Sequence, residues 1–383
     1  MRILLFTALC LSLSVPLGAA EDEEDGGEVD YLELGAMLLS DNNLERALTA
    51  LEQVDTEQAE FDFARYHALL GMTHARMGNH SPAGANLRKA IDAGSDDPLV
   101  YIHLAQSSFQ LEDYRGVLEA LDDAPARLYD LGSVWHMRAQ SHWLLDHRAQ
   151  ALAILDQAAR RFPSDHSFLR RKAFYLIEMG LYRRAAELGR RYLEQSQGTI
   201  TDYIAIGSAL RQSGQIEPAL RFLERARLMR PLHLDASKAL ARAYIDQDRL
   251  NVAADILYQA AQVERDLLVE AAELYRRAGQ YYRALSVNTR VADSKSKFKQ
   301  RLAILLELDQ YEQAAAMRRD LYRTGLLQDD DIRYGLAYAY FKTGDFDQTR
   351  ELLGALEDSA LFRKGAELRR AMEDCAGAVW KCL

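Results

Sequence analysis

A pattern of small and large apolar side chains that returns every 34 residues is the feature that most constrains the fold of this chain. It is clearest over residues 200–233, where apolar residues recur at helical spacing up to a break at Gly214, resume in the same way and stop at Pro231. This spacing predicts two short amphipathic helices folded back on each other. We expect the small residues Gly207 and Ala219 where these helices come closest, because a larger side chain would hold the backbones apart.

The order of these residues resembles the tetratricopeptide repeat, whose signature is an aromatic, a Leu-Gly pair and a Tyr, followed by a small residue, a large apolar residue, an alanine and a proline. The matching positions in this chain are Tyr203, Ile206, Gly207, Leu210, Ala219, Leu223, Ala226 and Pro231. The pattern recurs in six consecutive units of one period. One earlier and three later units bring the total to ten candidate helical hairpins.

The resemblance implies an all-α fold, a right-handed α-solenoid of about ten hairpins with a helix that caps its C-terminal end. We assign residues 29–358 to the solenoid and residues 359–383 to the capping helix and a disulfide loop. The chain has only 7 prolines and no serine or glycine tract, so we expect one elongated body without a flexible linker.

The first residues have the pattern of an export signal. Arg2 is followed by an apolar run too short for a permanent membrane span, and then by small residues up to Ala20. Residues 1–20 are therefore predicted to be a signal peptide, cleaved near Ala20 on export to a bacterial periplasm. Residues 21–28 are mostly Asp and Glu and are predicted to be a disordered acidic tail.

Two cysteines, Cys375 and Cys382, remain after removal of the predicted signal peptide. Because an exported protein meets an oxidising compartment, we expect them to form a disulfide that closes a small loop. The alternative is metal binding by the two thiolates, but zinc would need two further ligands. We therefore predict no metal site.

Charge and motifs narrow the function. The formal net charge of -10 disfavours nucleic acid as a bulk partner. The sequence contains no nucleophile elbow, phosphate loop, zinc-protease motif or dinucleotide fingerprint, so we predict a protein that is not an enzyme and uses no cofactor.

The resemblance also implies that the first helix of each hairpin lines a concave groove. Along that groove, aromatic side chains alternate with cations and amides that suit an extended peptide. The candidate groove residues are Phe109, His136, Gln140, Trp143, Arg170, Phe174, Arg211, Lys238 and Arg242. Nine basic residues stand against three acidic ones between Arg160 and Arg191, which is either solvated helix surface or a positive patch for an anionic partner.

These features predict a periplasmic adaptor that binds peptide segments of protein partners in a cell-envelope complex, with its oligomeric state left open. Exported proteins of this build resemble accessory subunits of TonB-type energy transduction, outer-membrane assembly and exopolysaccharide export. The alternative is a guide that binds an anionic polysaccharide during exopolysaccharide export.

Overall fold

The computed structural model describes residues 29–374 with the exception of residue 59. Within that part of the chain the regular elements are helices, and none is a strand. By its internal contacts the chain forms two units, one that ends at His147 (unit 1) and one that begins at Arg148 (unit 2). The predicted signal peptide, the acidic tail and the cysteine pair lie outside the described residues and stay predictions.

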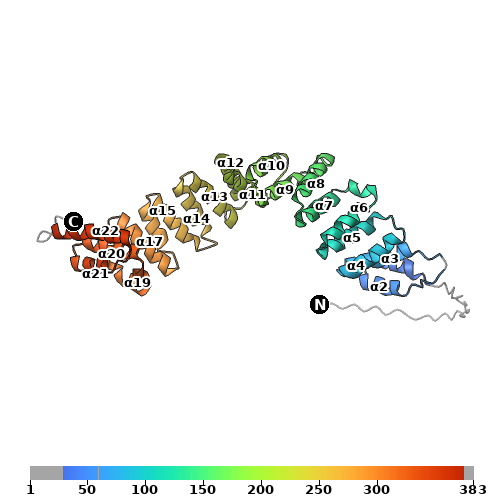
Figure 1. Ribbon diagram of the computed structural model, residues 1–383, viewed down its shortest axis with the longest axis horizontal. Helices are drawn as coiled ribbons and strands as arrows, with labels where there is room; N and C mark the ends of the chain where they lie inside the picture. Colours follow the sequence, from blue (N-terminus) through green and yellow to red (C-terminus); the bar gives the residue numbers. More distant parts are fainter. Residues whose placement is uncertain (1–28, 59, 375–383) are drawn as a thin grey trace, which may run out of the picture. The chain divides into compact units, whose positions relative to one another are not determined.

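Unit 1 is built from helices paired in chain order (Figure 1). They are α1 (Tyr31–Ser40) with α2 (Leu44–Glu52), α3 (Phe63–Arg76) with α4 (His80–Asp92), and α5 (Pro98–Gln110) with α6 (Tyr114–Asp122). A short 3₁₀ helix, η1 (Ala126–Asp130), and α7 (Gly132–Leu144) follow. Unit 1 thus holds three complete hairpins and the helix after them.

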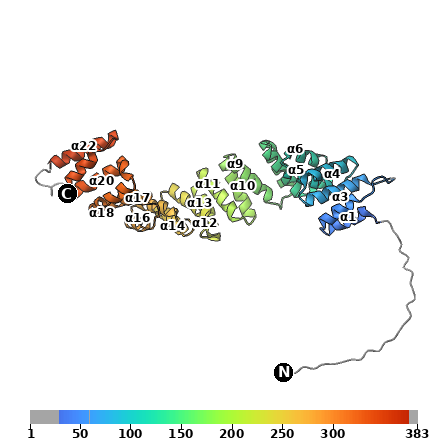
Figure 2. The same ribbon diagram turned by 90° about the horizontal axis from the view of Figure 1, so that it is seen from below.

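Unit 2 repeats the same arrangement, with successive hairpins side by side in chain order (Figure 2). After α8 (Arg148–Arg161), the pairs are α9 (Ser167–Glu178) with α10 (Tyr182–Gln195), α11 (Ile200–Gln212) with α12 (Ile216–Met229), α13 (Leu234–Asp246) with α14 (Leu250–Ala260), and α15 (Leu267–Arg277) with α16 (Tyr281–Asn288). They are followed by α17 (Ser294–Glu307) with α18 (Tyr311–Ala316) and α19 (Arg318–Arg323), then η2 (Leu326–Gln328), α20 (Asp330–Lys342) with α21 (Phe346–Gly354), and α22 (Ser359–Asp374). The all-α solenoid predicted from the repeat is confirmed.

The turn inside each hairpin is made by a residue in the left-handed region of the backbone. Gly214 has φ 80°, and Asp248 takes φ 57° at the corresponding place one hairpin later. After α11, the Gly214 N–H donates to the Arg211 carbonyl over 3.0 Å and the Gln215 N–H to the Leu210 carbonyl over 2.9 Å. This pattern ends the first helix and reverses the chain, as expected at the break at Gly214.

The small residues of the repeat lie where the helices of a hairpin touch. A Cβ added to Gly207 would stand 2.7 Å from Leu223 Cγ, and one added to Gly71 would stand 2.6 Å from Leu87 Cγ. Ala219 is fully buried in the same hairpin. The predicted alternation of small and large side chains therefore sets the helix spacing.

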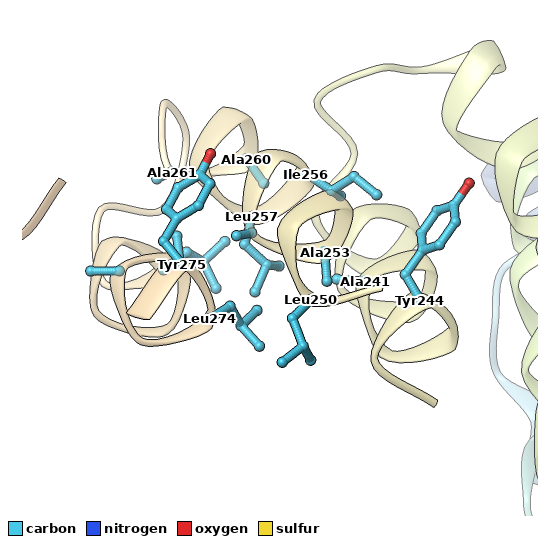
Figure 3. Close-up of a cluster of buried hydrophobic side chains, with 14 of the residues drawn as sticks. Ala241, Tyr244, Leu250, Ala253, Ile256, Leu257, Ala260, Ala261, Leu274 and Tyr275 are labelled. Carbon is cyan, nitrogen blue, oxygen red and sulfur yellow. The ribbon is translucent and has the colours of Figure 1, made fainter. Parts of the chain in front are cut away.

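The core of unit 2 runs through consecutive hairpins rather than lying within one. Figure 3 shows Leu250, Ala253 and Leu257 of α14 packed between α13 and α15, with the phenol oxygens of Tyr244 and Tyr275 pointing out of the cluster. Each hairpin buries its apolar face on its neighbours, so its stability depends on theirs.

The last hairpin is covered by α22. Gly365 of α22 is buried, and a Cβ there would stand 3.2 Å from Leu353 Cδ2 of α21. Asp330 of α20 accepts the Glu357 and Asp358 N–H groups over 2.8 and 2.6 Å, which fixes the chain just before α22 begins. The outer side of α22 is mostly polar and exposes Arg363, Lys364, Glu367 and Arg370, although Phe362 is also 50% exposed.

No helix within the described residues is both long and apolar enough to cross a membrane.

Candidate functional site

The predicted groove residues fall on both units. Unit 1 carries Phe109 on α5 and His136, Gln140 and Trp143 on α7, and unit 2 carries Arg170 and Phe174 on α9, Arg211 on α11, and Lys238 and Arg242 on α13. The two groups are described separately, and a single groove through all nine residues stays a prediction.

In unit 1, Phe109 belongs partly to the hydrophobic core. Its ring meets Tyr114 edge to face with centroids 5.4 Å apart, and it packs against the buried cluster of α3 to α6. His136, Gln140 and Trp143 are each partly buried on α7, within the same thirteen-residue helix. Phe109 therefore has a clear structural role, whatever else it contacts.

In unit 2 the five predicted residues lie on three successive first helices, α9, α11 and α13. We call them the first-helix face: Arg170, Phe174, Arg211, Lys238 and Arg242. Arg170 and Lys238 occupy the same place in their repeats, as do Phe174 and Arg242. The repeat thus sets these side chains at matching positions along the stacked helices.

Arg170 links α9 to α11. Its Nε donates to Asp202 Oδ1 over 2.6 Å, and its guanidinium carbon lies 5.0 Å from the centre of the Phe174 ring. Asp202 is fully buried and also accepts the Thr199 N–H over 2.8 Å and the Tyr192 hydroxyl over 3.1 Å. The buried carboxylate therefore holds Arg170 in place over the aromatic ring.

The next cations pair with carboxylates further along the chain, and these carboxylates are partly exposed. Arg211 donates to Asp246 Oδ2 over 2.9 Å, and the Lys238 ammonium lies 2.7 Å from Glu264 Oε2. Further along unit 2, Arg276 pairs with Glu307 and Lys299 with Asp329. A series of cation and carboxylate pairs thus joins each hairpin to the next.

These carboxylate partners could not be found from the repeat, because they lie outside the positions that define it. Asp202 is three residues after the helix N-cap Thr199, Asp246 ends α13, and Glu264 lies in the loop after α14. Arg242, in contrast, is exposed and has no carboxylate partner among the described residues. It is the cation of the first-helix face most open to a ligand.

The basic segment from Arg160 to Arg191 is also partly compensated. Lys172 on α9 forms an ion pair with Asp156 on α8, and Arg183 lies 3.5 Å from Glu187 one turn along α10. Arg184 and Arg191 on α10 are exposed and have no ion-pair partner among the described residues. Two exposed arginines of the basic segment thus lie on the surface of α10.

Comparison with known proteins agrees with this architecture. The sequence profile of the tetratricopeptide repeat matches residues 136–198 and 204–267. No curated protein matches the chain. Stacked helical hairpins of this repeat are typical of scaffolds for protein–protein interaction.

Solved structures of the same fold include the C-terminal part of a repeat protein from Cytophaga hutchinsonii, at 14% identity and a TM-score of 0.52, over 61% of this chain and 97% of that one. A tetratricopeptide repeat protein from Parabacteroides merdae is similar at 13% identity, over 64% of this chain and 100% of its own, with a TM-score of 0.44. PilF of Pseudomonas aeruginosa is similar at 18% identity and a TM-score of 0.40, over 54% of this chain and 93% of its own. The tetratricopeptide repeat predicted from the sequence is thus confirmed over residues 136–198 and 204–267.

Proposed function

We propose that this protein is a periplasmic adaptor that binds an extended peptide segment of a cell-envelope protein along the first-helix face of unit 2. The observation that carries the proposal is the pairing of cations with carboxylates on that face. Two of these pairs, Arg211 with Asp246 and Lys238 with Glu264, are partly exposed and offer donors beside acceptors on neighbouring repeats. The exposed part of Arg170 adds a further donor, while its partner Asp202 is buried. A peptide backbone, which carries N–H and C=O groups together, has matching chemistry.

The same pairing argues against the polysaccharide alternative. A polyanion needs a row of unpaired cations, whereas three of the four cations on this face already have a carboxylate partner. Phe174, which is partly buried under the Arg170 guanidinium, supplies an apolar contact that suits a peptide side chain.

The periplasmic location rests on the predicted signal peptide of residues 1–20. Among envelope systems, we propose an accessory role in TonB-type energy transduction as the first to be tested. A fusion of residues 1–28 to a reporter that is active only after export gives a direct test. Activity that persists after the apolar run is replaced by polar residues would contradict the location.

Binding itself is tested by pull-down of envelope proteins on the purified chain. We expect Phe174→Ala to weaken capture of a specific partner by about 2 kcal/mol if the ring is a central contact. Arg225→Ala on the exposed side of α12 is the matched control, because this arginine is exposed and away from the first helices. Equal loss in both variants, or none in either, would remove the first-helix face from the proposal.

A further inference from the structure

A second surface of unit 2 has the features of a docking site that the predicted groove does not include. A cleft of about 500 Å³ opens between α8, α9 and α10, and we call it the α8–α10 cleft. Its floor is formed by apolar side chains from all three helices: Leu152 and Ala153 from α8, Leu176 from α9 and Leu188 from α10. This size and lining are typical of a site that accepts large apolar side chains.

The charges around this cleft are unevenly matched. Asp156 on one wall is paired with Lys172, and Glu187 lies beside Arg183. Arg184 and Arg191, both of which line the cleft, are exposed and have no ion-pair partner among the described residues. They are seven residues apart on α10, so they project from one side of that helix about 10 Å apart along its axis.

The repeat supplies an internal comparison. Two periods further along, a cleft of about 380 Å³ opens between α12, α13 and α14, and Val252 and Gln259 stand where Arg184 and Arg191 stand in the α8–α10 cleft. Its carboxylates are bonded within the protein, because Tyr244 donates to Glu224 and the Tyr275 hydroxyl donates to Asp255. Repeat packing therefore produces such a cleft without the two arginines, and the arginines are not required to form it.

We propose that the α8–α10 cleft docks an acidic amphipathic helix of a partner protein. A large apolar side chain of this helix enters the floor beside Leu176 and Leu188, and two carboxylates two turns apart bind Arg184 and Arg191. An arginine pairs with a carboxylate through two parallel N–H···O bonds, which fixes the register of the docked helix. The apolar floor between the arginines selects such a helix over a polyanion without apolar groups.

The probe is a labelled synthetic helical peptide with two Glu residues seven positions apart and a Trp between them, titrated against the full chain by fluorescence anisotropy. We expect saturable binding that weakens about tenfold in the Arg184→Glu, Arg191→Glu double variant, because two attractive contacts become repulsive. A peptide with Lys in place of Glu should show the reverse preference. The matched control is Val252→Glu, Gln259→Glu in the other cleft, which should bind the acidic peptide as the unchanged chain does.

Several results would overturn the proposal. The first is that the acidic peptide does not bind the unchanged chain. The second is that it binds the unchanged chain and the Arg184→Glu, Arg191→Glu variant with equal affinity. The third is that a polyanion without apolar groups displaces the peptide. Tighter binding after deletion of residues 21–28 would assign the cleft to the chain's own acidic segment instead of a partner. Circular dichroism melts of all variants must coincide, so that a loss of binding reports the cleft and not unfolding. The test is independent of Phe174, so its failure leaves the proposed function standing.

Discussion

Arg170 on α9 donates to the buried carboxylate of Asp202 on α11 over 2.6 Å, so a residue predicted to face a ligand also joins two consecutive hairpins. The carboxylate is fully buried, whereas the arginine side chain is 40% exposed. One end of the guanidinium therefore neutralises a buried charge, and the remainder stays available at the surface.

Replacing Arg170 should destabilise unit 2. In Arg170→Ala the Asp202 carboxylate keeps its bonds to Thr199 and Tyr192 but loses its positive partner, and we expect a loss of about 2 kcal/mol in the free energy of unfolding. Arg242→Ala is the control, because Arg242 is exposed without a described partner and should change stability by less than about 0.5 kcal/mol. Urea unfolding followed by circular dichroism measures both. Equal midpoints would contradict a stabilising role for the pair.

The close approach inside each hairpin predicts opposite effects for two glycines. Gly207→Ala would place a Cβ 2.7 Å from Leu223 Cγ, and the strain should cost about 1–3 kcal/mol. Gly354, the last residue of α21, has nothing within 4 Å of an added Cβ, so Gly354→Ala should be neutral or stabilise by up to about 1 kcal/mol. Thermal unfolding compares the two. Destabilisation of the same size in both would mean that helix contact does not set the need for Gly207.

The tyrosine of α13 predicts a pH effect. Burial and the hydrogen bond donated to Glu224 raise the pKa of Tyr244 from 10.0 to about 12. Because the folded state favours the neutral phenol, the stability from this group is fully present below pH 10 and is lost as the pH rises from about 10 to about 12.

The tyrosinate absorbance of the folded chain, compared with that of Tyr244→Phe, isolates this group. The difference curve should have its midpoint well above pH 10, and Glu224→Gln should lower that midpoint because the bond to a carboxylate is removed. If the midpoint of the difference curve for the unchanged chain lies at the ordinary tyrosine pKa of 10.0, the Tyr244–Glu224 contact is absent in solution.

The Asp330 carboxylate holds the chain just before α22. Hydrogen bonds from the Asp358 and Glu357 N–H groups lower the pKa of Asp330 below its ordinary value of 3.8. The stability that this carboxylate contributes is therefore present above pH 3.8 and is lost as the pH falls below it. In Asp330→Ala we expect faster hydrogen exchange at both amides and through the first turn of α22. Asp347→Ala, at a highly exposed position on α21, is the control and should leave exchange at these amides unchanged.

The hairpins could be predicted because each depends on residues within one repeat. Gly207, Ala219 and Leu223 lie within seventeen positions of one another, and Gly214 and Asp248 mark turns that local backbone chemistry requires. The division of the described chain after His147 could not be read from the repeat, whose pattern continues through that point.

The candidate site was predictable only in part. Register along the first helices identified the positions of Arg170, Lys238 and Arg242, because the period alone fixes them. The partners Asp202 and Glu264 could not be found in this way, since they belong to a capping box and to a loop of variable length. The α8–α10 cleft depends on three helices whose packing the period does not reveal.

Site-specific photocrosslinking tests the central claim most directly. A photoreactive amino acid at Arg242, which is exposed on the first-helix face, should capture a discrete envelope protein in living cells, and Phe174→Ala in the same chain should reduce that capture. The same group at Arg225 on α12 should not capture this protein. Equal capture from both positions, or capture from Arg242 that Phe174→Ala leaves unchanged, would contradict binding along the first helices of unit 2.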